Sequence, residues 1–272
     1  MSGADIQDIA NEAFALLGTG RQIAPFTKTR PGFGLSDAYR VTAAVRAARE
    51  ARGERVVGRK IGFTNRTIWD EYGVHAPIWG YLYDGTVHHL RPEESLAVSL
   101  SGLAEPRIEP EIVFSLASAP DARMDERALL GCVEWIAHGF EIVQSIFPEW
   151  RFRAPDTVAA YGLHGMLWIG PRHAAAARAD AWMRELSAFE IDLVRNGAPA
   201  DHGRAGNVLG GPLSALRHLV ATLAADPLSP PLAAGEIVTT GTLTRAFPVA
   251  PGEEWTTRLT GIPLEGGRIR FA

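Results

Sequence analysis

Glu109 and Glu111 stand two residues apart in the segment Pro-Arg-Ile-Glu-Pro-Glu-Ile-Val-Phe-Ser at positions 106–115. Because side chains alternate between the faces of a β-strand, an extended chain here presents both carboxylates on one face and Ile108, Ile112 and Phe114 on the other. An exposed strand face also carries alternating charges. The pair alone therefore fits a solvated face as well as it fits a binding site.

A third acid, Glu141, lies in a second strand-like segment, Phe-Glu-Ile-Val-Gln-Ser at 140–145. Three carboxylates brought together repel one another and raise one another's pKa values unless a cation lies among them. With oxygen ligands and no thiol nearby, the expected cation is a hard one, Mg²⁺ or Mn²⁺ before Zn²⁺.

Lys60 lies in the short apolar strand-like segment 55–63, and the only other lysine among the 27 basic residues is Lys28. Arginine does not reproduce the compact, titratable charge of a lysine, so a lysine retained in this segment is a candidate for chemistry. The alternative is a surface lysine whose stem covers apolar surface.

The composition is that of a soluble globular protein: 272 residues, 46% hydrophobic and 21% charged, with a formal net charge of −4. This charge argues against a nucleic-acid or anionic-membrane partner. The single cysteine, Cys132, excludes an internal disulfide framework and is expected to be a buried small residue. The N-terminus carries acidic residues, so we expect no signal peptide. No apolar run is long enough for a membrane span, and we therefore expect a cytoplasmic location.

Hydrophobic periodicity predicts one compact unit with a β-rich body and helices packed on it. We expect an N-terminal helical portion at 1–75, which includes the lysine strand, and a β-rich metal-binding body at 76–272. The second helix is expected to be capped by Ser36 or Asp37. The predicted helices are 4–18, 36–53, 68–72, 127–138 and 213–224; the predicted strands are 55–63, 163–170, 188–195 and 235–242, with 254–271 completing the sheet.

Four segments in order resemble the 2-oxo acid hydratase and decarboxylase branch of the fumarylacetoacetate hydrolase superfamily. They are Gly-Arg-Lys-Ile-Gly-Phe-Thr-Asn at 58–65, Ile-Glu-Pro-Glu-Ile-Val-Phe at 108–114, Glu-Ile-Val-Gln-Ser at 141–145 and Gly-Glu-Ile-Val-Thr-Thr-Gly-Thr at 235–242. The resemblance extends from about residue 25 to residue 271.

The resemblance implies that Glu109, Glu111 and Glu141 ligate Mg²⁺ or Mn²⁺ and that Lys60 is the catalytic lysine of the family. Arg59 and Thr242, which lie in the first and last of these segments, are expected to bind the substrate. The resemblance also implies an α+β fold, a β-rich mixed sandwich or roll with the N-terminal helices packed against it, and a homo-oligomer.

Three protein ligands leave open positions on an octahedral ion for a substrate that chelates through a carboxylate and an adjacent 2-oxo group. The expected function is a lyase, either a decarboxylase or a hydratase, that acts on an unsaturated or dicarboxylic 2-oxo acid from aromatic-compound catabolism. A C–C hydrolase of 2,4-dioxo acids would use the same site. A non-catalytic member that keeps only the fold is the third possibility.

Departures from the family pattern concern the group that moves protons. Related hydratases commonly carry an acid at the position of Ile78, and an acid is often found at the position of His75. His164, between Gly162 and Gly165 at the start of a strand, is the candidate acid or base. The alternative is a histidine that only makes hydrogen bonds to the backbone. His138, three residues before Glu141, is expected to cap a helix end; the alternative is a partner that supports a metal ligand.

Overall fold

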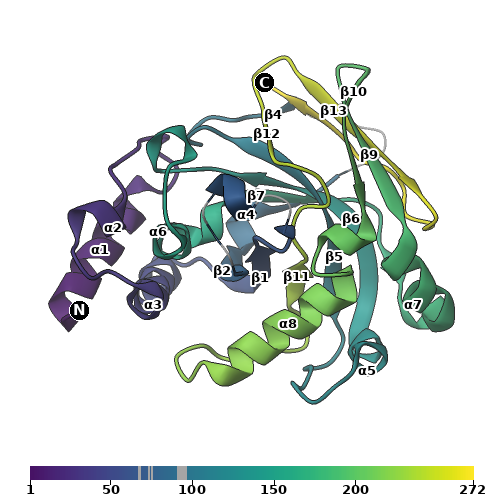
Figure 1. Ribbon diagram of the computed structural model, residues 1–272, viewed down its shortest axis with the longest axis horizontal. Helices are drawn as coiled ribbons and strands as arrows, with labels where there is room; N and C mark the ends of the chain where they lie inside the picture. Colours follow the sequence, from purple (N-terminus) through teal and green to yellow (C-terminus); the bar gives the residue numbers. More distant parts are fainter. Residues whose placement is uncertain (67–68, 73, 75, 91–96) are drawn as a thin grey trace.

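The computed structural model describes residues 1–272 except 67–68, 73, 75 and 91–96, so His75 lies outside the described residues. Two β-sheets form the body, and helices pack around them (Figure 1). The N-terminal helices lie at one side of the larger sheet and the strands of the smaller sheet lie at the other. The predicted α+β class, with helices packed on a β-rich body, is confirmed.

The larger sheet has the strand order β2-β1-β11-β5-β6-β7-β3, with β12 paired to β5 and β8 paired to β6. Its long central strands, β5 and β6, are antiparallel, and their register sets Glu109 opposite Glu141. The strands are β1 (Val56–Gly62), β2 (Ile78–Tyr83), β3 (Val87–His89), β5 (Arg107–Leu116), β6 (Val133–Val143), β7 (His164–Ile169), β8 (His173–Ala174), β11 (Ile237–Thr239) and β12 (Phe247–Pro248).

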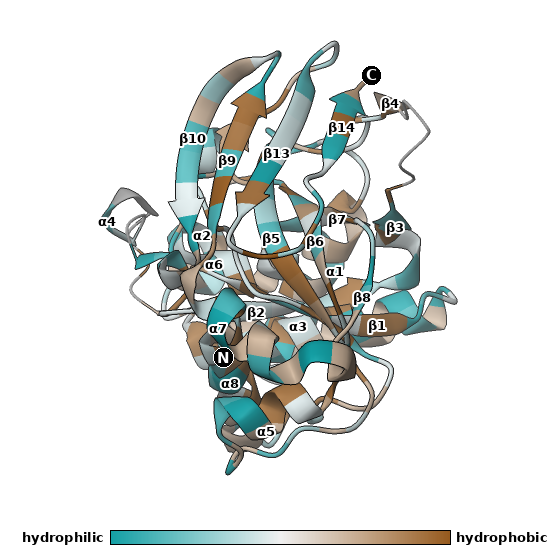
Figure 2. Ribbon diagram, turned by 90° about the vertical axis from the view of Figure 1, so that its right-hand side faces the viewer, coloured by the Kyte–Doolittle hydropathy of each residue, from teal (hydrophilic) through white to brown (hydrophobic). Residues whose placement is uncertain are grey.

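The smaller sheet has the order β10-β9-β13-β14-β4 and packs on the larger one through a shared core. Burial alternates along β9, and Figure 2 shows the hydropathy of these strands changing in bands along their length. The C-terminal segment 254–271 contains β13 and β14 of this second sheet, whereas the sequence predicted that it completes the first. The strands are β4 (Ala97–Val98), β9 (Glu190–Arg195), β10 (Ala198–Arg204), β13 (Glu254–Thr260) and β14 (Arg268–Phe271).

Helices cover the sheets on two sides. No helix within the described residues combines the length and the apolar character needed to span a membrane. The α-helices are α1 (Gly3–Leu16), α2 (Phe26–Thr29), α3 (Leu35–Ala51), α4 (Trp69–Tyr72), α5 (Glu126–Gly131), α6 (Ala154–Ala159), α7 (Ala179–Ala188) and α8 (Pro212–Ala225); the 3₁₀ turns are η2 (Asp84–Thr86), η3 (Pro148–Trp150), η4 (Tyr161–Leu163), η5 (Ala176–Arg178) and η6 (Ala205–Asn207).

The two faces of β5 have different surroundings, as the alternation in its sequence predicts. Ile112 and Phe114 are fully buried in a core that includes Leu216 and Leu219 of α8. Burying side chains of this size stabilises a fold by about 1.5–3 kcal/mol each. This packing fixes which face is the core face, so the glutamates of β5 point to the other face.

Two predicted helix boundaries are wrong. The N-cap of α3 is Gly34, whose extended backbone begins the helix without a side-chain cap, so Ser36 and Asp37 lie within its first turn. The helix predicted at 127–138 ends at Gly131, and β6 begins at Val133. His138 is therefore a strand residue and caps no helix, because the apolar residues of 133–143 are buried on both faces of the sheet.

The lysine strand is part of the larger sheet. β1 pairs in parallel with β11 and antiparallel with β2, so it lies inside the sheet although it precedes residue 75. Strand β11 itself is shorter than predicted, because the chain turns at Gly241, where φ is +92°.

The N-terminal helices are attached to α6 by a buried carboxylate. Asp156 accepts hydrogen bonds from the backbone N–H and the hydroxyl of Thr27 at 2.8 and 2.7 Å. It also accepts one from the N–H of Arg153 at 2.8 Å, at the start of α6. Thr42 of α3 adds a hydrogen bond to the carbonyl of Val158 at 3.1 Å.

We expect Asp156→Ala to lower the free energy of unfolding by about 2–4 kcal/mol, because three hydrogen-bond donors lose the buried carboxylate that accepts from them. Urea denaturation measures this loss. Asp156→Asn, which keeps one acceptor oxygen in place, is the matched control and should cost less. Equal stability of Asp156→Ala and the unchanged protein would contradict the role of this carboxylate.

Candidate functional site

A cavity of about 410 Å³, including the part open to solvent, lies at the end of the larger sheet near the N-terminal helices. Its charged residues are Lys60 and Glu109, and most of its other walls are apolar. The lining residues are Lys60, Gly62, Phe63, Glu109, Val143, Trp150, Gly162, Leu163, Thr242 and Ala246.

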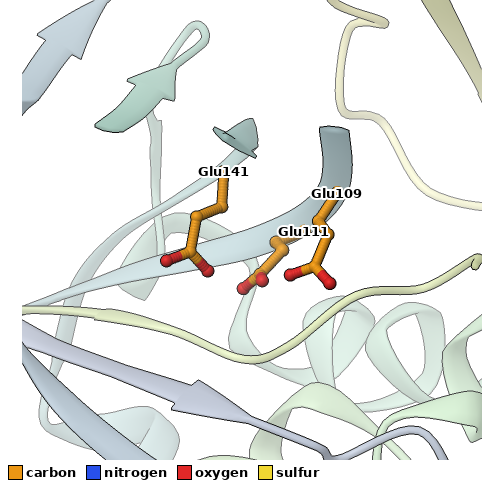
Figure 3. A group of neighbouring side chains, drawn as sticks. All are labelled: Glu109, Glu111 and Glu141. Atoms are coloured by element: carbon orange, nitrogen blue, oxygen red, sulfur yellow. The ribbon is translucent and has the colours of Figure 1, made fainter. Parts of the chain in front are cut away.

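The structure brings Glu109, Glu111 and Glu141 together at this cavity. One carboxylate oxygen from each lies within 4.8 Å of one from each of the others. Figure 3 shows the three side chains leaving β5 and β6 in the same direction. Glu111 and Glu141 have no exposed surface, and Glu109 is partly exposed toward the cavity.

The side chain of Lys60 reaches the same group from β1. Its Nζ lies 3.2 Å from Oε2 of Glu141 and donates a hydrogen bond to the carbonyl oxygen of Gly162 at 2.9 Å. Gly80 leaves room for the turn η4, which contains Gly162, because a Cβ at residue 80 would lie 2.7 Å from the carbonyl oxygen of Tyr161. The lysine is therefore buried and held at the floor of the cavity, not spread on a surface.

The carboxylate of Glu111 is fixed by the turn after β11. Its Oε2 accepts a hydrogen bond from the N–H of Gly241 at 2.7 Å. A Cβ at residue 241 would lie 1.8 Å from Oγ1 of Thr64, so only glycine fits this turn. Sequence reasoning missed this contact, and its only signal was the pair of glycines in 235–242.

His164 lies behind Glu141 and does not line the cavity. Its Nδ1 is 2.8 Å from Oε1 of Glu141, and its Nε2 is 2.9 Å from Oγ1 of Thr86. Both ring nitrogens thus have protein partners, and 3% of the residue is exposed. This placement suits a residue that orients Glu141 better than one that meets the substrate.

Arg59 and Thr242 are placed differently from each other. Arg59 follows the alternation of β1 away from Lys60: its guanidinium pairs with Glu236 at 3.1 Å and lies over the ring of Tyr81. The structure does not bring Arg59 to the carboxylates. Thr242 lines the cavity, and its hydroxyl donates to the carbonyl oxygen of Thr244 at 3.0 Å.

Burial and mutual repulsion shift the charges of the site. Burial raises the pKa of Glu109 to about 7. Burial, together with the charges of Glu141 and Glu109, also raises the pKa of Glu111 well above its ordinary value. Burial alone would raise the pKa of Glu141, but Lys60 and then His164 lower it to about 2. Burial opposes the charge of Lys60, yet Glu141 and the other two glutamates raise its pKa.

These residues fit a divalent cation. Within the part of the chain that the structure describes, Oε1 of Glu111 and Oε2 of Glu141 are buried without a hydrogen bond. The ammonium of Lys60 is an ion-pair partner of the second of these oxygens, but its geometry is not that of a hydrogen bond. Lys60 neutralises one of three converging carboxylates, and all the donor atoms are oxygens. Mg²⁺, Mn²⁺ and Ca²⁺ are the ions that such a set binds.

Sequence comparisons find relatives over most of the chain. The chain is 34% identical over 262 residues to 2-hydroxyhexa-2,4-dienoate hydratase of Comamonas testosteroni, with 94% of each chain covered. It is 30% identical over 243 residues to 4-oxalocrotonate decarboxylase of Pseudomonas sp. (strain CF600), with 88% of this chain and 87% of that protein covered.

Solved structures extend the likeness to the whole chain. A 4-oxalocrotonate decarboxylase from Pseudomonas putida G7, complexed with magnesium and adipate, superposes with a TM-score of 0.89 at 27% identity and covers 100% of this chain and 99% of that one. A fumarylpyruvate hydrolase from Pseudomonas aeruginosa, in complex with Mn²⁺ and pyruvate, shares the fold at a TM-score of 0.60 and 14% identity, over 79% and 88% of the two chains. Residues 74–269 match the fumarylacetoacetate (FAA) hydrolase C-terminal family. The chain belongs to the fumarylacetoacetate hydrolase family.

Proposed function

We propose that the protein is a divalent-metal-dependent lyase, a hydratase or decarboxylase, that acts on an unsaturated or dicarboxylic 2-oxo acid. The observation that carries the proposal is the set of three converging carboxylates with the ammonium of Lys60 at the floor of one cavity. The relatives named hydratases and decarboxylases and the magnesium-complexed decarboxylase support it. We place the substrate in the breakdown of aromatic compounds.

Glu109, Glu111 and Glu141 would hold the cation. When bound, an ion such as Mg²⁺ polarises the 2-oxo group of a chelating substrate and stabilises the negative charge that develops there. Gly241 and His164 fix the orientation of Glu111 and Glu141 through hydrogen bonds of 2.7 and 2.8 Å. Glu109, at the cavity wall, is the ligand nearest the solvent side.

Lys60 would act on the same reacting group. Its Nζ is held by Gly162 and Glu141, and the neighbouring carboxylates keep it protonated. It can therefore stabilise a developing enolate oxygen by hydrogen bonding or transfer a proton from Nζ. Phe63, Trp150 and Leu163 form an apolar wall of the same cavity.

The position where related hydratases carry an acid is apolar. Ile78 is 3% exposed and packs beside Gly62, since a Cβ at residue 62 would lie 3.2 Å from its Cγ1 and 3.4 Å from Nζ of Lys60. Among the described residues, Lys60 and Glu109 are the titratable side chains that line the cavity, so hydration would use one of them to move a proton, whereas decarboxylation needs only the protonation of the enolate. We propose His164 as the residue that orients Glu141 in either reaction.

Incubation with a panel of 2-oxo acids and Mg²⁺, with the products followed by mass, tests the function. Loss of CO₂ identifies a decarboxylase, and gain of water identifies a hydratase. Cleavage into pyruvate and a second acid would instead identify a C–C hydrolase, and no conversion of any substrate would contradict the proposal.

We propose a homo-oligomeric, cytoplasmic enzyme, and light scattering measures the oligomeric state.

Lys60→Met should lower kcat by roughly 10²–10⁴-fold, because the proton donor and its charge are removed. The substitution should not weaken cation binding, since it removes a positive charge from beside the three glutamates. Steady-state kinetics and Mn²⁺ titration measure the two effects. Lys28→Met, at the exposed other lysine, is the control and should match the unchanged protein. Full activity of Lys60→Met would remove Lys60 from the mechanism.

Cation binding should strengthen as the pH rises from about 5.5 to 8. In the metal-free protein the raised pKa values of Glu109 and Glu111 keep protons on these groups, and the protons must leave before a cation binds. Because these raised pKa values favour the protonated carboxyl groups in the folded state, the metal-free fold keeps its full stability below about pH 4.5. It loses part of that stability as the pH rises toward 7. The increase in the thermal unfolding midpoint on adding Mg²⁺ should therefore be larger at pH 8 than at pH 5.5.

Glu111→Gln is the control for this pH effect, because it removes one of the titrating carboxylates but keeps its shape. Its midpoint should respond weakly to Mg²⁺ at both pH values. An equal Mg²⁺ response of the unchanged protein at pH 5.5 and 8 would count against titration of these glutamates.

A further inference from the structure

His138 is a buried histidine on the face of the larger sheet opposite to the carboxylates. It lies on β6, one residue from Gly139, which is the register partner of Glu111 on β5. The residue is 2% exposed, and its Nδ1 is 3.0 Å from the backbone carbonyl oxygen of Glu111. Because a carbonyl oxygen can only accept, Nδ1 must carry the hydrogen.

The other ring nitrogen connects to the smaller sheet. Nε2 of His138 is 2.7 Å from Oγ1 of Thr257, on β13. The same Oγ1 accepts the N–H of Gly267 at 2.8 Å, which leaves the hydroxyl hydrogen of Thr257 free to be donated to Nε2. The three hydrogen bonds thus run in one direction, from Gly267 to Thr257, to a neutral His138, and to Glu111.

We propose that His138, held by Thr257, is a positioning residue for the metal ligand Glu111. The inference rests on the proposed metal site. Glu111 is then fixed at both ends: its carboxylate by the N–H of Gly241 and its backbone carbonyl by His138. The smaller sheet, which contributes no residue to the cavity wall within the described residues, acts on the site through this chain.

Backbone placement matters here because Glu111 has little room to compensate. Its side chain is fully buried, and Oε1 has no partner among the described residues, so this oxygen is the atom available to a cation. A shift of β5 at residue 111 moves that oxygen relative to Glu109 and Glu141. Partners that orient metal ligands typically change metal affinity about 10–100-fold when they are removed.

Thr257→Val tests the proposal, because valine keeps the shape of threonine but removes the hydroxyl that holds His138. Mn²⁺ affinity, measured by titration with detection of free Mn²⁺, should fall roughly 10-fold. His138→Leu, which removes the donor to Glu111, should weaken binding at least as much. His138→Asn, whose amide N–H₂ can take the place of Nδ1, should restore most of the affinity.

Ile269→Ala is the matched control, since Ile269 is a buried core residue of the smaller sheet outside the hydrogen-bonded chain. It should lower the thermal stability and leave the Mn²⁺ affinity unchanged. If His138→Leu fails to fold, Thr257→Val and Ile269→Ala still decide the question.

Three results would overturn the inference. Folded Thr257→Val and His138→Leu proteins that bind Mn²⁺ as tightly as the unchanged protein would refute it alone. An equal loss of affinity in Ile269→Ala would refute it too, because general loosening would then explain the effect. Failure of the unchanged protein to bind Mn²⁺ would overturn the metal site and this inference together.

Discussion

The repulsion among three buried carboxylates is the constraint on which the site depends. Taking an ionised carboxylate out of water costs several kcal/mol unless it is paired, and Lys60 supplies one charge for three. The metal-free protein meets the remaining cost by raising the pKa values of Glu109 and Glu111, while Glu141 stays ionised between Lys60 and His164. A divalent cation supplies the two missing positive charges, so the site is built for one.

The larger sheet turns this constraint into a fixed geometry. Core packing on one face of β5 and β6 forces the glutamates onto the other face, and the register sets Glu109 directly opposite Glu141. Opposite Glu111 stands Gly139, which has no side chain to fill the space between the carboxylates, and a Cβ there would lie 2.7 Å from the carbonyl oxygen of Trp168. Gly139 therefore allows β7 to pack closely against β6 and also leaves room for a cation.

Unusual backbone conformations gather at the cavity wall. Phe63, Trp150 and Leu163 have φ values of +54°, +57° and +64°, a region that bulky residues rarely adopt. Tyr161 and Gly162 join Leu163 in three successive left-handed residues that aim the carbonyl of residue 162 at Lys60. Such conformations cost of order 1–3 kcal/mol each and persist where their surroundings hold them. Here the hydroxyl of Tyr161 donates to the carbonyl of Ala13 in α1, which gives the N-terminal helices a part in holding the turn.

The sequence by itself determined the elements whose chemistry is local. Alternation in 106–115 predicted which residues of β5 face the core, and the three acids with one retained lysine predicted an oxygen-ligand site for a hard cation. Its resemblance to a known family predicted the α+β fold. These features follow from residue type and spacing, which a linear chain displays directly.

Only the tertiary structure decided how distant segments meet. The sequence placed His138 at a helix end, although the packing of both sheets makes it a strand residue that joins Thr257 to Glu111. It grouped Arg59 with Lys60, although alternation on β1 sends the two to opposite faces. The contacts of Gly241 with Glu111 and of His164 with Glu141 depend on strand register across 130 and 23 residues. Register is set by the packing of whole sheets, and no local pattern encodes it.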